Sequence, residues 1–159
     1  MKKFELTSEF VTDIFGTKLF RIKALISFGD VEEGEFGGYI EKEENLDHSG
    51  DAWVSGNARV SGDAWVSGNA RVYGDARVYG DAWVCGDKDY SCANGFGRFG
   101  RNTTFFKTKG GDVTVSCGCF SGSINEFREK VKETHKDTKP AKEYLMLADL
   151  MEYHFSEEE

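Results

Sequence analysis

Arginine, tryptophan and tyrosine recur at fixed spacing through the middle of this 159-residue sequence. Either Trp or Arg stands directly before a valine at every sixth position, and the pairs Trp65/Trp83 and Arg59/Arg77 are each eighteen residues apart. Guanidinium groups bind carboxylates and phosphates, and indole rings bury large apolar areas. These residue types at this spacing predict a binding surface. The candidate interface residues are Trp53, Trp65, Trp83, Arg59, Arg71, Arg77, Tyr73 and Tyr79.

A second candidate binding segment follows the repeats. No acidic residue lies between Asp89 and Asp112, although the whole chain has a formal net charge of −8. Cations alternate with aromatic rings there, which suits a phosphate, a stacked nucleotide base or an acidic partner surface. The alternative is a glycine-rich connector whose phenylalanines belong to the core. The residues predicted to form this basic aromatic loop, within residues 95–109, are Phe96, Arg98, Phe99, Arg101, Lys107 and Lys109.

Histidine is the usual general base of enzymes, and the chain has three histidines, which are His48, His135 and His154. They lie far apart in the sequence. His48 occupies the position of the repeated valine, where we expect a half-buried corner residue. His135 ends a predicted helix, where a cationic side chain suits the helix dipole. We therefore predict no catalytic residue, no enzymatic activity and no cofactor.

Four cysteines are the remaining residues with potential chemistry. A four-thiolate zinc site uses cysteine pairs at characteristic spacings, and Cys117-Gly-Cys119 is not such a pair. We expect buried, reduced thiols and no bound metal. The other two cysteines are Cys85 and Cys92.

The repeat that carries the first set of candidates predicts a β-solenoid. From Ala52 to Gly86 each unit reads Val, then Ser or Tyr, Gly, Asn or Asp, Ala, and Arg or Trp. A period of six does not match a helical face, whereas it suits short strands joined by tight turns. Valine and alanine would share the inner side of each strand. Glycine followed by Asn or Asp suits the turn.

These units resemble the hexapeptide repeat of left-handed β-helix proteins, in which an aliphatic residue recurs at every sixth position. The resemblance implies a triangular coil of three hexads, and often trimers packed through the outer faces. We expect about three coils, the first irregular, because Ile40 and Leu46 share the spacing of six while Leu46 to Val54 is eight. The layout also resembles uncharacterised phage and bacterial proteins with a short solenoid and an α+β C-terminal segment. Acyltransferases of this fold need a longer solenoid, a protruding loop and a histidine between subunits, and here the repeats run unbroken.

Stacking at eighteen residues sorts the outer side chains into three faces. One carries Trp53 and Arg71, a second carries Arg59 and Arg77, and the third carries two tryptophans. All three tryptophans are thus expected to point outward, and an exposed aromatic patch of this kind indicates an interface. We expect a homo-oligomer, a dimer or trimer. The alternative is that the C-terminal segment folds back over the patch.

The flanking segments complete a mainly β fold. We predict an N-terminal β cap over residues 1–30, the β-helix over 31–88, and a C-terminal α+β module over 89–159 with a β-hairpin and two helices. Ser123 and Glu126 form a capping box for the first helix, and Pro140 suits the first turn of the second. The apolar side of the second helix is wide, which indicates a helix that is sandwiched or dimerises.

The sequence leaves three functions open. The first is a non-catalytic β-solenoid binding and assembly protein, which self-associates and binds a protein partner. The phage resemblance implies an inhibitor of a host defence system in the cytoplasm of a bacterial cell. The alternatives are a sponge for a small anionic ligand such as a nucleotide signal, and a relative of hexapeptide acyltransferases. The net charge of −8 argues against nucleic acid and anionic membranes, and no apolar run is long enough to span a bilayer.

Overall fold

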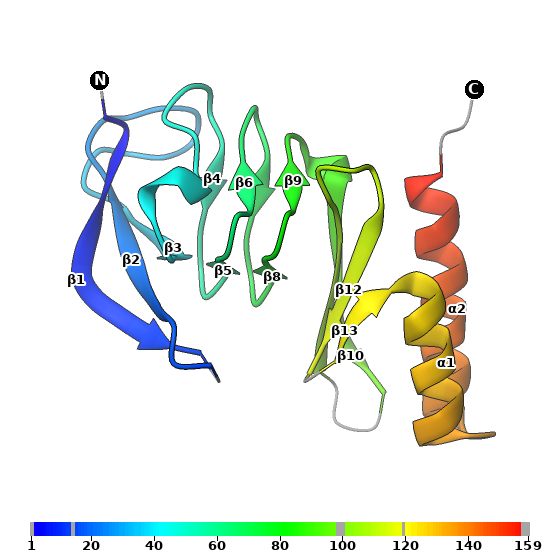
Figure 1. Ribbon diagram of the computed structural model, residues 1–159. Helices are drawn as coiled ribbons and strands as arrows, with labels where there is room; N and C mark the ends of the chain where they lie inside the picture. Colours follow the sequence, from blue (N-terminus) through cyan, green and yellow to red (C-terminus); the bar gives the residue numbers. More distant parts are fainter. Residues whose placement is uncertain (1, 14, 98–100, 119, 157–159) are drawn as a thin grey trace. The chain divides into compact units, whose positions relative to one another are not determined.

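The computed structural model describes residues 2–13, 15–97, 101–118 and 120–156. The chain forms two compact units, an N-terminal unit over Met1–Asp89 and a C-terminal unit over Tyr90–Glu159. The N-terminal unit consists of strands with short 3-10 turns at Glu43–Asn45 (η1) and Asp87–Asp89 (η2), and the C-terminal unit combines a sheet with two helices (Figure 1). The predicted mainly β class with two C-terminal helices is therefore confirmed.

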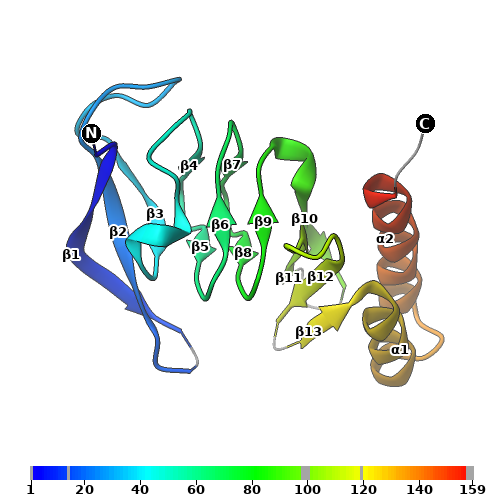
Figure 2. The same ribbon diagram turned by 45° about the horizontal axis from the view of Figure 1, so that its top comes forward.

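Six two-residue strands make up the repeated part of the N-terminal unit. Strands eighteen residues apart pair in parallel, β4 with β7, β5 with β8 and β6 with β9, which confirms the three stacked rows predicted from the spacing (Figure 2). The strands are β4 (Trp53–Val54), β5 (Arg59–Val60), β6 (Trp65–Val66), β7 (Arg71–Val72), β8 (Arg77–Val78) and β9 (Trp83–Val84).

Valine and alanine fill the inside of the repeat, as predicted. Each repeat valine from Val54 to Val84 and each repeat alanine from Ala52 to Ala82 is at most 1% exposed. The interior is narrow, because an alanine methyl group is all that fits beside each valine. A larger residue at either position would force neighbouring side chains out of their rotamers.

The first turn of the repeat is irregular, and the irregularity has the predicted size. Ile40 of β3 (Phe36–Ile40) pairs with Val60, and Leu46 pairs with Val66. Both partners are twenty residues apart instead of eighteen. The slip of two residues lies between Leu46 and Val54, where the sequence spacing is eight.

The N-terminal strands lengthen one wall of the repeat. Strands β1 (Phe4–Thr12), β2 (Lys18–Ala24) and β3 pair antiparallel, and β3 then pairs in parallel with β5. The result is a five-stranded sheet with the order β1-β2-β3-β5-β8 (Figure 1). The N-terminal β cap therefore pairs edge to edge with one row of repeat strands, an arrangement that the sequence pattern does not predict.

Lys3 caps the backbone of the first regular turn. Its ammonium group donates to the carbonyl oxygens of Ala52 at 2.7 Å and Gly50 at 3.4 Å, and it lies 4.6 Å from the Phe28 ring centroid. Burial lowers the pKa of Lys3, and the nearby Asp47 and Asp51 act in the opposite direction. Lys3 is fully buried, and its ammonium group supplies hydrogen bonds to the Gly50 and Ala52 carbonyl oxygens, which have no neighbouring strand to bond them.

The C-terminal unit contains a four-stranded antiparallel sheet with strands in sequence order. Two strands, joined by Lys109-Gly110-Gly111, were predicted, so that prediction was incomplete. Most of the described part of the segment 95–109, named a loop above, lies in strands: β10 runs to Phe96, and β11, within which a strand was predicted from Asn102 onward, is Arg101–Lys107. The strands are β10 (Tyr90–Phe96), β11 (Arg101–Lys107), β12 (Val113–Cys117) and β13 (Phe120–Ser123).

Two helices pack on this sheet, α1 (Ile124–His135) and α2 (Lys139–Phe155). The Ser123 hydroxyl accepts from the Glu126 amide and the Glu126 carboxylate accepts from the Ser123 amide, so the predicted capping box is confirmed. Pro140 lies in the first turn of α2, also as predicted. The shared core includes Phe105, Val115, Phe127, Val131, Tyr144, Ala148 and Met151.

The turns of the repeat should differ in their tolerance of a methyl group. Gly68 and Gly80 both have positive φ, 63° and 67°, where an alanine is strained by about 1–2 kcal/mol. A Cβ on Gly68 would also collide with the Cys85 carbonyl oxygen, whereas a Cβ on Gly80 meets no atom within 4 Å. We expect urea denaturation to show a loss of about 3 kcal/mol or more for Gly68→Ala and about 1–2 kcal/mol for Gly80→Ala. Equal losses would contradict the tight stacking of successive turns.

Candidate binding face

The first predicted face is largely covered by the N-terminal segment. Trp53 is only 3% exposed, and its ring lies edge-on to Phe28 with centroids 5.3 Å apart. Arg71 forms an ion pair with Asp30 at 3.3 Å. The prediction that all three tryptophans are exposed is therefore wrong for Trp53, because residues before the repeat fold over it. Tyr73 remains exposed on this face.

Trp65 and Trp83, the two tryptophans predicted to share the third outer face, lie side by side in the structure. The rings of Trp65 and Trp83 lie 5.5 Å apart at an interplanar angle of 53°, and Trp83 is 39% exposed. Ser67, expected on the same outer face, is buried. The pair thus offers a smaller apolar surface than two fully exposed indoles would.

The arginine row extends beyond the repeat. Arg77 pairs with Arg59, Arg59 pairs with Tyr39 of β3, and Tyr39 pairs with Arg21 of β2. Directly paired residues carry their side chains on the same side of a sheet, so these four share the outer face of the five-stranded sheet. Tyr79 lies two residues after Arg77 on the same side and is half-buried.

Aromatic rings order the cations at one end of this row. The Arg21 guanidinium carbon lies 5.3 Å from the Phe36 ring centroid and 5.9 Å from that of Tyr39. Lys23 Nζ lies 5.7 Å from the same Phe36 ring, which is 53% exposed. Such contacts hold a cation in place against the ring face. We define the basic aromatic face as Arg21, Lys23, Phe36, Tyr39, Arg59 and Arg77.

A carboxylate fixes the geometry of this end further. Glu9 Oε2 accepts from Arg21 Nη1 at 2.9 Å and from the Tyr39 hydroxyl at 3.4 Å. Arg21 Nε also donates to the Gly37 carbonyl oxygen at 3.3 Å. Arg21 and Tyr39 are therefore held in position before any partner arrives, which reduces the entropy that a partner must overcome on binding.

Four members of this face were missed by the sequence analysis. Tyr39 precedes Ile40 as Arg59 precedes Val60, so its place in the row could have been read from the phase of the repeat. Arg21 and Lys23 lie within the predicted β cap over residues 1–30, for which no binding role was predicted. Their place beside the arginine row depends on strand pairing, and Phe36 reaches the face because the β2–β3 register shifts between Arg21 and Lys23.

The arrangement suits recognition of an anionic surface. Neighbouring strands lie about 4.8 Å apart, so the row from Arg21 to Arg77 spans about 14 Å. Arginine forks pair with carboxylates in two-point contacts, and exposed rings supply apolar area between them.

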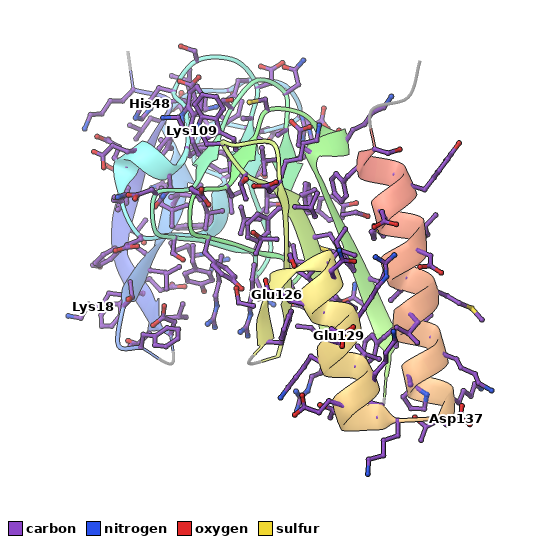
Figure 3. The ribbon with its side chains drawn as sticks, turned by 45° about the vertical axis from the view of Figure 1, so that its right-hand side comes forward. Lys18, His48, Lys109, Glu126, Glu129 and Asp137 are labelled. Carbon is purple, nitrogen blue, oxygen red and sulfur yellow. The ribbon has the colours of Figure 1, made fainter. Side chains whose placement is uncertain are left out.

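The histidines of the described residues have structural contacts. His48, labelled in Figure 3, stacks on Phe4 with centroids 4.2 Å apart, and its Nδ1 accepts from the Lys3 amide at 3.0 Å. This is the predicted half-buried corner residue. His135 ends α1, as predicted, and its ring lies 5.6 Å from that of Tyr144. Both histidine rings thus pack against aromatic side chains.

The predicted basic aromatic loop does not form one surface among the described residues. Phe96 and Arg101 pair across β10 and β11, whereas Lys107 ends β11 about 20 Å farther along the strand. Lys109 follows in the turn before β12 and is exposed. The neighbouring Phe105 and Phe106 are buried, which agrees with the alternative that the phenylalanines belong to the core. The other two residues of the prediction, Arg98 and Phe99, lie outside the described residues.

The cysteines differ from the expectation of burial. Cys85 is exposed, and Cys92 and Cys117 are half-buried. Their reduced state agrees with the prediction for these three, and Cys119 lies outside the described residues. Within the described ranges, no cluster of three or more histidine, cysteine or acidic side chains has the geometry to hold a metal ion.

The comparison with protein families agrees with the strand pairing. A family model described as the YdcK Beta solenoid repeat matches residues 52–68 and 70–86. Residues 52–86 of the chain therefore form a β-solenoid repeat. Every repeat unit in the two matched segments carries Trp or Arg directly before its valine. No curated protein matches the chain. Among the residues described, no helix has the length and apolar character needed to cross a bilayer.

The phenol of Tyr144 should lose its proton at a higher pH than an ordinary tyrosine. It is buried, its hydroxyl donates to the Phe96 carbonyl oxygen at 3.3 Å, and the Cys117 thiol lies 3.8 Å from it. Burial, with a further contribution from Cys117, raises the pKa of Tyr144 from 10.0 to about 12. Near-ultraviolet absorbance should therefore show a tyrosinate step near pH 12 that Tyr144→Phe removes and Tyr153→Phe, on the same helix, retains.

The raised pKa of Tyr144 also predicts how the stability of the fold changes with pH. Because the pKa of Tyr144 is higher in the folded chain, its contribution to stability is complete below pH 10 and is lost as the pH rises from about 10 to about 12. The Tyr144→Phe variant should lose less of its denaturation midpoint over this interval than the parent. An equal loss in both would contradict the assignment.

Proposed function

We propose that this β-solenoid is a non-catalytic binding protein that self-associates and uses its basic aromatic face to bind an acidic surface of a partner protein. The observation that carries the proposal is the continuous row Arg21–Tyr39–Arg59–Arg77 with Phe36 and Lys23 beside it. The chain as a whole is acidic, with a formal net charge of −8. A local cationic row on an acidic chain favours binding to a defined patch over general attraction to polyanions.

The mixture of charge and exposed aromatic area favours a protein partner. Protein interfaces are enriched in arginine and aromatic residues, and their strongest positions combine both. The contacts of Arg21 with Glu9, Phe36 and Tyr39 fix one end of the row, while Arg77 is exposed at the other end. We expect the fixed end to set the orientation of the partner and the exposed end to supply charge.

A small anionic ligand is the second candidate function. Arg59 and Arg77 are directly paired on neighbouring strands, so two guanidinium groups are within reach of one phosphate. This is the geometry that a sponge for a nucleotide signal would use. It differs from the protein-binding proposal because it needs neither Phe36 nor Lys23.

The finer parts of the proposal come from the sequence resemblance. They are a left-handed hexapeptide coil, an origin among phage and related bacterial proteins, and action in the cytoplasm of a bacterial cell as an inhibitor of host defence. The hexapeptide acyltransferase alternative is tested separately by incubation with acyl-coenzyme A, where hydrolysis or transfer above background would support it.

Charge reversal tests the binding face. We expect the immobilised parent protein to retain a stoichiometric partner from a bacterial lysate, and Arg59→Glu/Arg77→Glu to lose it, because two favourable contacts become repulsive. The matched control is Lys130→Glu/Lys132→Glu, which makes the same change in net charge at exposed positions of α1. The affinity of the purified pair should fall about 100-fold or more in the first variant and within about threefold of the parent in the second. Equal capture by both variants would refute the proposed face.

Thermal shift separates the two candidate functions. We expect inorganic phosphate and nucleoside triphosphates to leave the melting temperature of the parent unchanged. A rise with these anions that Arg59→Glu/Arg77→Glu abolishes and Phe36→Ala retains would favour the sponge instead.

A further inference from the structure

Helix α2 has two apolar sides that face opposite ways. One side belongs to the core of the C-terminal unit, through Tyr144, Ala148 and Met151 among others. The other side carries Met146, Leu150 and Tyr153, which are 69%, 57% and 65% exposed. Spacings of four and three residues place these three side chains in one line along the helix. We call this line the α2 stripe.

The α2 stripe is the most exposed run of large apolar side chains on a single element of the described residues. Isolated exposed apolar residues are ordinary, but three in one line on a helix predict contact with another apolar surface. By comparison, Trp83 of the solenoid pair is 39% exposed. The wide apolar side predicted for this helix is thus divided between the core and the surface.

We infer that the α2 stripe is the seam through which two copies of this chain associate, with the two α2 helices antiparallel. This inference deepens the self-association in the proposed function and rests on it. The side of α2 that carries the stripe is nearly symmetric about the midpoint between Met146 and Leu150. Lys142 lies four residues before Met146, and Tyr153 lies three residues after Leu150. Turned end for end, Met146 of one copy meets Leu150 of the other and Lys142 meets Tyr153. A two-fold axis makes each of these contacts twice.

Charge favours the antiparallel arrangement. Lys139 and Lys142 lie in the first half of α2 together with one acid, Glu143, so this half has a net charge of about +1, and Asp149 and Glu152 lie in the second half. Arg128 holds both carboxylates, Asp149 at 2.8 Å and Glu152 at 2.9 Å, so one guanidinium group is shared between two acids. The second half of the helix therefore keeps net negative charge, which an antiparallel copy meets with lysines and a parallel copy meets with more acid. The helix dipoles also oppose each other in the antiparallel pair.

The limited width of the stripe sets the strength of the dimer. The exposed positions of the other helix, α1, are mostly polar or charged, and they include Glu126 and Glu129, labelled in Figure 3, so α1 does not widen the apolar surface. A stable interface usually buries about 800 Å² on each partner, and three side chains with their polar neighbours supply less than that. We therefore expect a dissociation constant in the micromolar range.

Sedimentation equilibrium tests the seam. The parent should dimerise reversibly between about 10 µM and several hundred µM. Met146→Ser/Leu150→Ser should raise the dissociation constant about tenfold or more, because both central apolar contacts of the seam are lost. Glu129→Ser/Glu133→Ser is the matched control, since it changes two exposed residues four apart on α1 and should dimerise like the parent. Circular dichroism melting shows whether each variant remains folded.

Disulfide cross-linking tests whether the two α2 helices of the dimer are antiparallel. With Cys85 replaced by serine, Met146→Cys and Leu150→Cys variants are oxidised separately and as a mixture. Antiparallel helices predict more cross-linked dimer in the mixture than in either variant alone, whereas parallel helices predict the reverse.

The outcomes separate the seam from the proposed function. Unchanged dimerisation of Met146→Ser/Leu150→Ser overturns the seam, and weaker dimerisation of Trp65→Ser/Trp83→Ser would then return the interface to the solenoid. A parent that stays monomeric at several hundred µM overturns the self-association and the seam together. Partner capture by the basic aromatic face is measured independently and is unaffected by either result.

Discussion

The narrow interior of the solenoid is the constraint on which the rest of the N-terminal unit depends. Only valine and alanine fit inside, so each turn must place its inner residues directly over those eighteen positions earlier. The residue before each valine is thereby fixed on the outside at the same height and in the same column. The packing of the core fixes the pairing register of the strands, and this register places the arginine and tryptophan side chains in rows.

The N-terminal strands convert one of these rows into a larger face. A repeat alone would offer Arg59 and Arg77 at the end of a two-strand ladder. Pairing of β3 with β5 adds Tyr39, and pairing of β2 with β3 adds Arg21. The sheet that protects the edge of the repeat thus also doubles the length of the row, so one set of backbone hydrogen bonds both stabilises the unit and aligns the side chains of the row.

Sequence reasoning succeeded where the signal was local or periodic. The interior valines, the two-residue slip before Val54 and the Ser123 capping box follow from spacings of three to eight residues, and the stacked pair Trp65/Trp83 follows from the regular repeat of eighteen. It failed where distant segments meet. Trp53 is covered by Phe28, Arg21 joins the arginine row through strand pairing, and Phe96 belongs to a strand that pairs with β11. No periodicity reports such contacts, because they depend on which edges the chain brings together.

The slip of two residues between Leu46 and Val54 has a consequence for how such a chain can change in length. Downstream of it, removing or duplicating a whole turn of eighteen residues would leave every outer column aligned, since residues eighteen apart occupy the same column. A change of six residues would preserve the valine core equally well but would rotate each later column to the next face. The core would tolerate three times as many length variants as the alignment of the outer columns does, so the outer columns, rather than the core, make eighteen residues the unit of length change.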